Sequence, residues 1–138
     1  MQDTETNRRI AERMSAFCLH TLKMLREVPA GVEFKHIRRR LTHSVTDAGM
    51  HFRDVDRAEP QREFIAKQLV EIQKSLSESE YWIGLIEGLK PDLQKIGAVH
   101  TEVRNLMNLF ERIRKEAETR PTKTSRRQRF RTSGCRQA

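Results

Sequence analysis

The sequence predicts an all-α fold, an antiparallel up-down-up-down bundle of four helices in a single domain. Apolar residues recur three or four positions apart along four separate stretches, which is the spacing that places side chains on one face of a helix. The chain contains only 6 glycines and 4 prolines, and the segments between them are rich in Leu, Glu, Arg and Lys, which favour helices. Its 138 residues match the size of one domain.

The first predicted helix covers residues 4–28 and ends at the breakers Pro29 and Gly31. Its stripe has one polar interruption and consists of Ile10, Met14, Phe17, Thr21, Met24 and Val28. The second predicted helix ends near residue 57 or 58, and its stripe consists of Ile37, Leu41, Val45, Ala48, Phe52 and Val55. Both stripes alternate steps of four and three residues, so each presents a single apolar face.

The third predicted helix opens near Pro60, because proline is tolerated in a first helical turn, and it runs to about Leu89. Its stripe consists of Ile65, Leu69, Ile72, Leu76, Ser79, Ile83 and Ile86. After a break at residues 88–91, the fourth helix runs to about Thr119. The stripe of this last helix consists of Ile96, Val99, Val103, Leu106, Phe110 and Ile113. The connections are short, so consecutive helices are expected to pack antiparallel.

Further apolar residues flank the four stripes, so the apolar faces are wider than one seam requires. These residues are Leu19, Leu22, Leu25, Phe34, Met50, Phe64, Val70, Tyr81, Trp82, Leu85, Met107 and Leu109. They either broaden the face that packs into the core or form a second apolar face for a partner or another subunit. The sequence leaves both alternatives open.

The sequence predicts a cytoplasmic location with no membrane contact. The first residues are polar and acidic and lack the basic and apolar regions of a secretory signal. No apolar stretch approaches the roughly 18 residues that span a bilayer. The two cysteines, Cys18 and Cys135, are too few for a disulfide framework or a metal-ligand set, so reduced thiols are expected.

Positive charge is concentrated in residues 120–138, which we call the tail. The net charge is +8, and the tail holds seven of the 27 Lys and Arg residues but no Asp or Glu, so the rest of the chain is nearly neutral. Such a segment cannot bury a core and is predicted to be disordered alone, with arginines that neutralise phosphates and a phenylalanine that stacks on an unpaired base. The predicted nucleic-acid contacts are Lys123, Arg126, Arg127, Arg129, Phe130, Arg131 and Arg136. The alternative is a terminus that only aids solubility.

Three adjacent arginines in the second helix, Arg38, Arg39 and Arg40, are a second candidate site for RNA or DNA. Adjacent helical residues point about 100° apart, so these three side chains cannot all face one phosphate backbone. One or two of them are candidates for contact with a partner. The alternative is a solvated helix face with local ion pairs.

Two other pairs of residues are candidates for an oligomer interface. Arg53 and Arg57 belong to a charged cluster near the turn between the second and third helices. This cluster either forms ion pairs between subunits or consists of exposed pairs that contribute about 0–1 kcal/mol each. Tyr81 and Trp82 are adjacent and point in different directions, so one is expected to enter the core and the other to mark the interface.

The sequence lacks the motifs of the common enzyme classes that a helical bundle supports. A Glu-x-x-His motif occurs once, at Glu33 and His36, whereas a di-iron bundle requires two. A Gly-rich phosphate loop, a His-Glu-x-x-His motif and a Gly-x-Ser-x-Gly motif are all absent. We therefore predict no catalytic residue, no metal and no cofactor.

Two segments resemble a known family of helical proteins. They are Ser44–Asp54, continued by Arg57, Ala58 and the Arg-Glu-Phe-Ile-Ala-Lys run of residues 62–67, and Ser79–Ile86 with its Tyr-Trp pair. Over residues 8–117 the chain resembles the 23S rRNA intervening-sequence proteins, although His51 stands where that family usually has Asn. The resemblance implies a ring-shaped homo-oligomer, commonly a pentamer, with no known catalytic activity. A structural relative of that family is the accessory variability determinant of diversity-generating retroelements, which binds a reverse transcriptase and nucleic acid.

The sequence and the resemblance together predict a non-catalytic, homo-oligomeric scaffold that binds RNA or single-stranded nucleic acid. One alternative is an accessory subunit of a reverse transcriptase, in which the main partner is the polymerase and nucleic acid is held jointly. The other alternative is a protein-interaction module with no nucleic-acid role.

Overall fold

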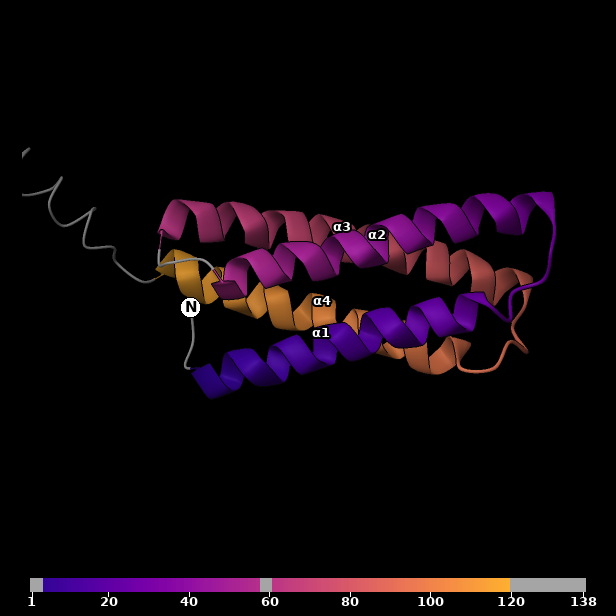
Figure 1. Ribbon diagram of the computed structural model, residues 1–138, viewed down its shortest axis with the longest axis horizontal. Helices are drawn as coiled ribbons and strands as arrows, with labels where there is room; N and C mark the ends of the chain where they lie inside the picture. Colours follow the sequence, from indigo (N-terminus) through magenta and orange to yellow (C-terminus); the bar gives the residue numbers. More distant parts are fainter. Residues whose placement is uncertain (1–3, 58–60, 120–138) are drawn as a thin grey trace, which may run out of the picture.

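The computed structural model describes residues 4–57 and 61–119, which form four helices and no strand (Figure 1). The helices are α1 (Thr4–Leu25), α2 (Val32–Arg57), α3 (Arg62–Leu89) and α4 (Ile96–Thr119). They run up and down along one long axis, and each packs antiparallel to the helix before it. The predicted four-helix bundle is therefore confirmed. None of the described helices is both long enough and apolar enough to cross a bilayer.

Helix α1 ends three residues before the predicted boundary. The amides of Arg26, Glu27 and Val28 bond to carbonyls three residues earlier, at 3.2, 3.0 and 3.3 Å, so the chain tightens into a narrower turn. Val28 still lies in the core. The apolar stripe thus continues past the α-helix, which explains why its periodicity alone placed the boundary too late.

All four apolar stripes face the interior. The described members of the stripes are buried except Ile65, which is partly exposed and packs against the core. The two polar interruptions are buried as well, because their hydroxyls bond to carbonyls four residues earlier. Thr21 Oγ1 donates to the Phe17 carbonyl and Ser79 Oγ to the Ser75 carbonyl, each at 2.8 Å. These hydroxyls therefore enter the core with their hydrogen-bonding capacity satisfied.

Some of the apolar residues that flank the stripes broaden the core, and the others lie on an exposed surface. Leu25 and Phe34 are buried, and another group packs partly buried against the core: Leu22, Trp82, Met107 and Leu109. The remaining group is exposed on the outer surfaces of α1, α2 and α3, and it comprises Leu19, Met50, Phe64, Val70, Tyr81 and Leu85. Only the first two groups broaden the core.

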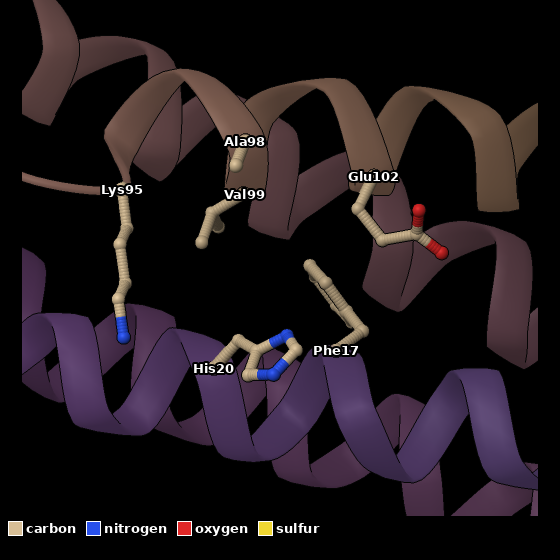
Figure 2. A pocket seen from close by; sticks show the side chains of 6 residues that line it. All are labelled: Phe17, His20, Lys95, Ala98, Val99 and Glu102. Carbon is tan, nitrogen blue, oxygen red and sulfur yellow. The ribbon is translucent and has the colours of Figure 1, made fainter.

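The four seams of the bundle are not equally close. Helices α2 and α3 pack most extensively, and side-chain hydrogen bonds join them at Ser44 with Ser79 (2.8 Å) and at His51 with Gln68 (2.6 Å). Helices α1 and α4 make the sparsest contacts of any neighbouring pair. A cavity lies in this last seam (Figure 2).

The connection between α3 and α4 folds back onto the bundle. Leu93 is buried there, and its carbonyl accepts the Ile96 amide at 3.3 Å. Lys95 then precedes α4 with a φ of 71°, the left-handed region that glycine normally occupies. It is the one residue other than glycine with a positive φ among those the structure describes.

Candidate functional site

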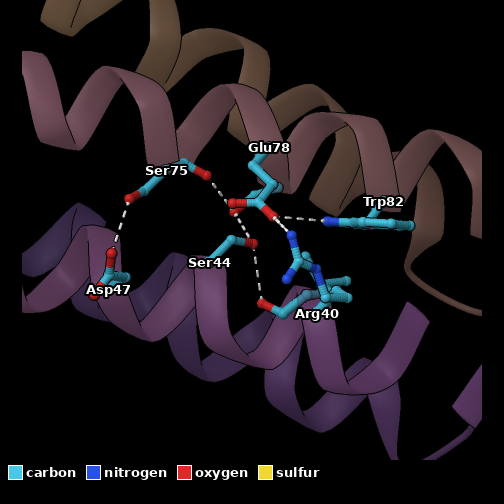
Figure 3. Close-up of polar contacts among 8 residues, drawn as sticks. Arg40, Ser44, Asp47, Ser75, Glu78 and Trp82 are labelled. Carbon is cyan, nitrogen blue, oxygen red and sulfur yellow. Dashed lines mark hydrogen bonds and ion pairs between the residues drawn. The ribbon is translucent and has the colours of Figure 1, made fainter. Parts of the chain in front are cut away.

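Arg40 of α2 and Trp82 of α3 meet on the outer side of the α2–α3 seam (Figure 3). The Arg40 guanidinium donates from Nη2 to Glu78 Oε1 at 2.9 Å, and the same carboxylate oxygen accepts the Trp82 indole N–H at 3.4 Å. The guanidinium carbon of Arg40 lies 5.9 Å from the centroid of the Trp82 ring, which is within the range of a cation–π interaction. One carboxylate thus holds the arginine and the tryptophan together.

Two further rings extend this arrangement. His36, one turn before Arg40, meets Trp82 edge to face at 5.7 Å between centroids, and Tyr81 meets it in the same way at 4.9 Å. We call His36, Arg40, Glu78, Tyr81 and Trp82 the Trp82 cluster. Trp82 is partly buried against the core, whereas Tyr81 is 60% exposed. The structure therefore points the two adjacent aromatic residues in different directions, and the interface role of Tyr81 stays a prediction.

The chemistry of the Trp82 cluster favours planar and apolar partners over phosphate. Tyr81 and His36 present exposed rings, and aromatic side chains of this kind are common at protein interfaces. A phosphate that approached Arg40 would also meet the Glu78 carboxylate, which already neutralises that arginine. The net electrostatic attraction for nucleic acid at this place is therefore small.

The other arginines of the predicted basic cluster lie in different environments. Arg38 is half-buried and donates from Nη2 to the Val28 carbonyl at 2.7 Å, which fastens α2 to the turn after α1. Arg39 is exposed and has no hydrogen bond or ion pair with another described residue. Of the three adjacent arginines, two are thus held by groups of the protein, and Arg39 alone is free within the part of the chain that the structure describes.

The predicted interface arginines lie far from the Trp82 cluster. Arg53 is exposed, and its Nη2 lies 3.6 Å from Asp54 Oδ1. Arg57 is exposed at the last position of α2. Arg53 follows Arg40 by 13 helical positions, which is a distance of about 20 Å along the helix axis. The predicted tail contacts lie outside the described residues, and they are Lys123, Arg126, Arg127, Arg129, Phe130, Arg131 and Arg136.

Sequence reasoning did not find Glu78, which organises the Trp82 cluster. A spacing of four residues between Glu78 and Trp82 would have suggested their contact on one helix face. The partnership with Arg40 crosses between helices and depends on how α2 and α3 are aligned. Local sequence spacing carries no signal for such a contact.

The described residues offer no alternative site for metal or thiol chemistry. Within residues 4–57 and 61–119, no group of three His, Cys, Asp or Glu residues is placed to hold a metal ion. Cys18 is half-buried where α1 crosses α2, and its Sγ lies 3.3 Å from the Val45 carbonyl, to which it donates. Desolvation by burial raises the pKa of this thiol to about 11, although backbone hydrogen bonds oppose the rise. The thiol is therefore protonated and weakly nucleophilic near neutral pH.

Comparison with models of known protein families, with curated proteins and with solved structures finds no match to this chain. The resemblance to the intervening-sequence proteins consequently stays a prediction.

Proposed function

We propose that this protein is a non-catalytic, homo-oligomeric helical scaffold that binds RNA or single-stranded nucleic acid through its tail. The observation that carries this proposal is the separation of charge along the chain. The tail has seven basic residues and no acidic one, whereas residues 1–119 have 20 basic and 19 acidic residues. When such a cluster of basic side chains neutralises phosphates, counterions are released from the nucleic acid, and this release favours binding.

The contacts within the bundle support this division. Two of the three adjacent arginines of α2 are engaged inside the protein, Arg38 by the Val28 carbonyl and Arg40 by Glu78. Phosphate binding by these three arginines would have to break the Arg40 ion pair or rely on Arg39 alone. The tail has no acid of its own to compete with phosphate, and Phe130 adds an aromatic ring for stacking.

The outer face of α3 supports self-association. Val70, Tyr81 and Leu85 are all exposed and lie on one side of this helix, because 11 and 4 residues separate them and both spacings are near whole helical turns. Water-exposed apolar residues aligned in this way are typical of surfaces that bind another chain. A ring of five subunits, which the family resemblance implies, would carry five tails and raise avidity without any new contact.

A titration of labelled single-stranded oligonucleotide at several salt concentrations tests the nucleic-acid role. We expect a chain of residues 1–119 to bind more weakly than the full chain, with a log–log salt slope shallower by roughly 0.7 for each lost phosphate contact. Phe130→Ala should lose about 1–3 kcal/mol per stacked base with little change in slope. Arg112→Gln is the matched control, because it removes an exposed arginine of α4 that belongs to neither candidate site and should leave the slope nearly unchanged.

Light scattering after size exclusion tests the assembly. A particle several times heavier than the 16.2 kDa chain is expected, and Val70→Glu should lower that mass while helicity is retained. Thr101→Glu, at an exposed position of α4, is the control that should leave the mass unchanged. A monodisperse particle of one chain would contradict the homo-oligomer.

A second candidate function is a protein-interaction module, and the Trp82 cluster is the observation that favours it. Its exposed rings and neutralised arginine suit a protein partner better than a polyphosphate. Equal affinity of the full and truncated chains for the oligonucleotide, or no binding by either, would move the conclusion to this function. A reverse transcriptase as the partner rests on the family resemblance alone, and a reverse-transcriptase gene beside this one would favour it.

A further inference from the structure

A cavity of about 260 Å³ opens in the seam between α1 and α4 (Figure 2). Its apolar walls come from Phe17 of α1 and from Ala98 and Val99 of α4, and its rim carries His20, Lys95 and Glu102. The opening lies in the first turns of α4, next to the connection from α3. It occupies the seam with the sparsest helix contacts, so a ligand can enter without separating a closely packed pair of helices.

The charged and polar groups on the rim differ in whether they already have a partner within the protein. Glu102 Oε1 accepts hydrogen bonds from Arg13 Nη2 and Nε at 3.1 and 3.3 Å, so a partner on α1 already neutralises this carboxylate. The side chains of His20 and Lys95 have no hydrogen bond or ion pair with another residue that the structure describes. The unpaired groups at the mouth are therefore an ammonium and an imidazole, both of which can donate to an anion.

The backbone conformation of Lys95 is an independent indication of a ligand site at the mouth of the cavity. A φ of 71° is unfavourable for a residue with a side chain, and such conformations collect at ligand and active sites. In Figure 2 the Lys95 side chain extends from the start of α4 across the seam toward α1, beside His20. The strained residue thus brings its positive charge to the mouth of the cavity.

We propose that this cavity binds a small organic anion with an aromatic or branched aliphatic body. The body enters between Phe17, Ala98 and Val99, and its carboxylate or similar anionic group binds Lys95 Nζ and accepts a hydrogen bond from His20. The volume is sufficient for this ligand class, because a cavity of about 150 Å³ holds benzene and this one is larger. This ligand site is separate from the proposed nucleic-acid role of the tail.

Benzoate is a suitable probe, with benzamide as its uncharged analogue of nearly the same shape. The full chain would be labelled at Ala and Val methyl groups, and both compounds would be titrated by NMR. Benzoate should shift the Ala98 and Val99 methyl signals in a saturable way, while those of Ala66 and Val70 on α3 stay constant. Dissociation constants in the millimolar range are expected for so small a probe, and benzamide should bind more weakly.

Two variants and two controls separate the apolar and the charged contributions. Lys95→Gln should weaken benzoate binding about two- to fivefold, the effect of an exposed ion pair, and leave benzamide unaffected. Ala98→Leu should fill the cavity and abolish the shifts of Val99 for both compounds. Lys67→Gln and Ala66→Leu make the same changes at exposed positions of α3 and should have no effect.

Three outcomes would overturn the proposal. Absence of saturable shifts at Ala98 and Val99 would show that the cavity takes no ligand of this class. Equal affinities for benzoate and benzamide, unaffected by Lys95→Gln, would exclude a role for the anionic group. A fall in particle mass caused by Ala98→Leu, without any benzoate binding to the unaltered chain, would show that a second copy of the protein occupies the cavity.

Discussion

The hydrogen bond between Ser44 and Ser79 provides a sharp test of how α2 and α3 are joined. Both side chains are buried, with exposures of 1% and 0%, and their hydroxyl oxygens lie 2.8 Å apart. Each hydroxyl also has a carbonyl within reach, that of Ser75 at 2.8 Å for Ser79 and that of Leu41 at 3.2 Å for Ser44. The shorter of these distances indicates that Ser79 donates to its carbonyl and Ser44 donates to Ser79.

This geometry limits the cost of removing either hydroxyl. In Ser79→Ala the Ser44 proton can turn to the Leu41 carbonyl, and in Ser44→Ala the Ser79 hydroxyl keeps its bond to Ser75. Neither variant leaves a buried donor without an acceptor, so each should lose one net hydrogen bond, about 0.5–1.5 kcal/mol, rather than the larger cost of an orphaned group. The double variant loses both bonds, the one between the serines and the one from Ser79 to the Ser75 carbonyl, so the two single effects should add to about 1–3 kcal/mol with a coupling free energy near zero.

Urea denaturation followed by circular dichroism, at one fixed protein concentration, measures this cycle. Each Ser-to-Ala change also gains helix propensity of up to about 0.7 kcal/mol. Ser77→Ala, at an exposed position of α3, is the control that measures this gain alone. A coupling free energy above about 1 kcal/mol would refute this reasoning, because it would show that Ser44 does not turn to the Leu41 carbonyl when Ser79 is removed. Losses above about 3 kcal/mol in either single variant would show that an unsatisfied group is left behind.

Three further predictions follow from the described side chains. Trp82→Ala should lower the free energy of unfolding by up to about 3–5 kcal/mol, because the ring packs against the core. Tyr81→Ala, at a 60% exposed position, should lower it far less. Equal shifts in the thermal midpoint of the two variants would contradict this placement of the two rings. Cys18 has a pKa of about 11 in the fold against 9.0 when unperturbed, so the unfolded chain loses its proton first and stability should fall as pH rises from 9 toward 11, as measured by urea denaturation at stepped pH. Replacement of this cysteine by serine should remove that contribution. Lys95→Gly should relieve the left-handed strain and raise the free energy of unfolding by up to about 1 kcal/mol, and a lower thermal midpoint would show that the conformation is not strained.

The helices were predictable because a bundle repeats one local signal. The alternation of steps of three and four residues occurs within each helix and needs no knowledge of the other three. It gave the observed ends of α3 at Leu89 and of α4 at Thr119. The error at the end of α1 arose where Val28 stays apolar and buried after the α-helix has ended.

The candidate sites were less predictable because they depend on how the helices align. Arg40 and Trp82 are separated by 42 positions, and their contact requires the particular alignment that Ser44 and Ser79 fix between α2 and α3. The conformation of Lys95 gave no sequence signal, because left-handed positions are normally recognised by a glycine or asparagine. The cavity beside it results from incomplete packing between the first and last helices, which no single stripe encodes.

The seam between α1 and α4 also determines how the bundle opens. The other neighbouring pairs are joined directly by residues 26–31, 58–61 and 90–95, whereas α1 and α4 are brought together only after two intervening helices have folded. Closing that long loop costs more chain entropy, and the sparse contacts of the seam offset only a small part of this cost. Amide hydrogens of α1 should therefore exchange with solvent through a smaller opening free energy than those of α2 and α3. An opened seam presents the groove that α1 normally fills, so the proposed self-association would give α1 of a second chain a place to bind and would provide a route to exchange the first helix between subunits.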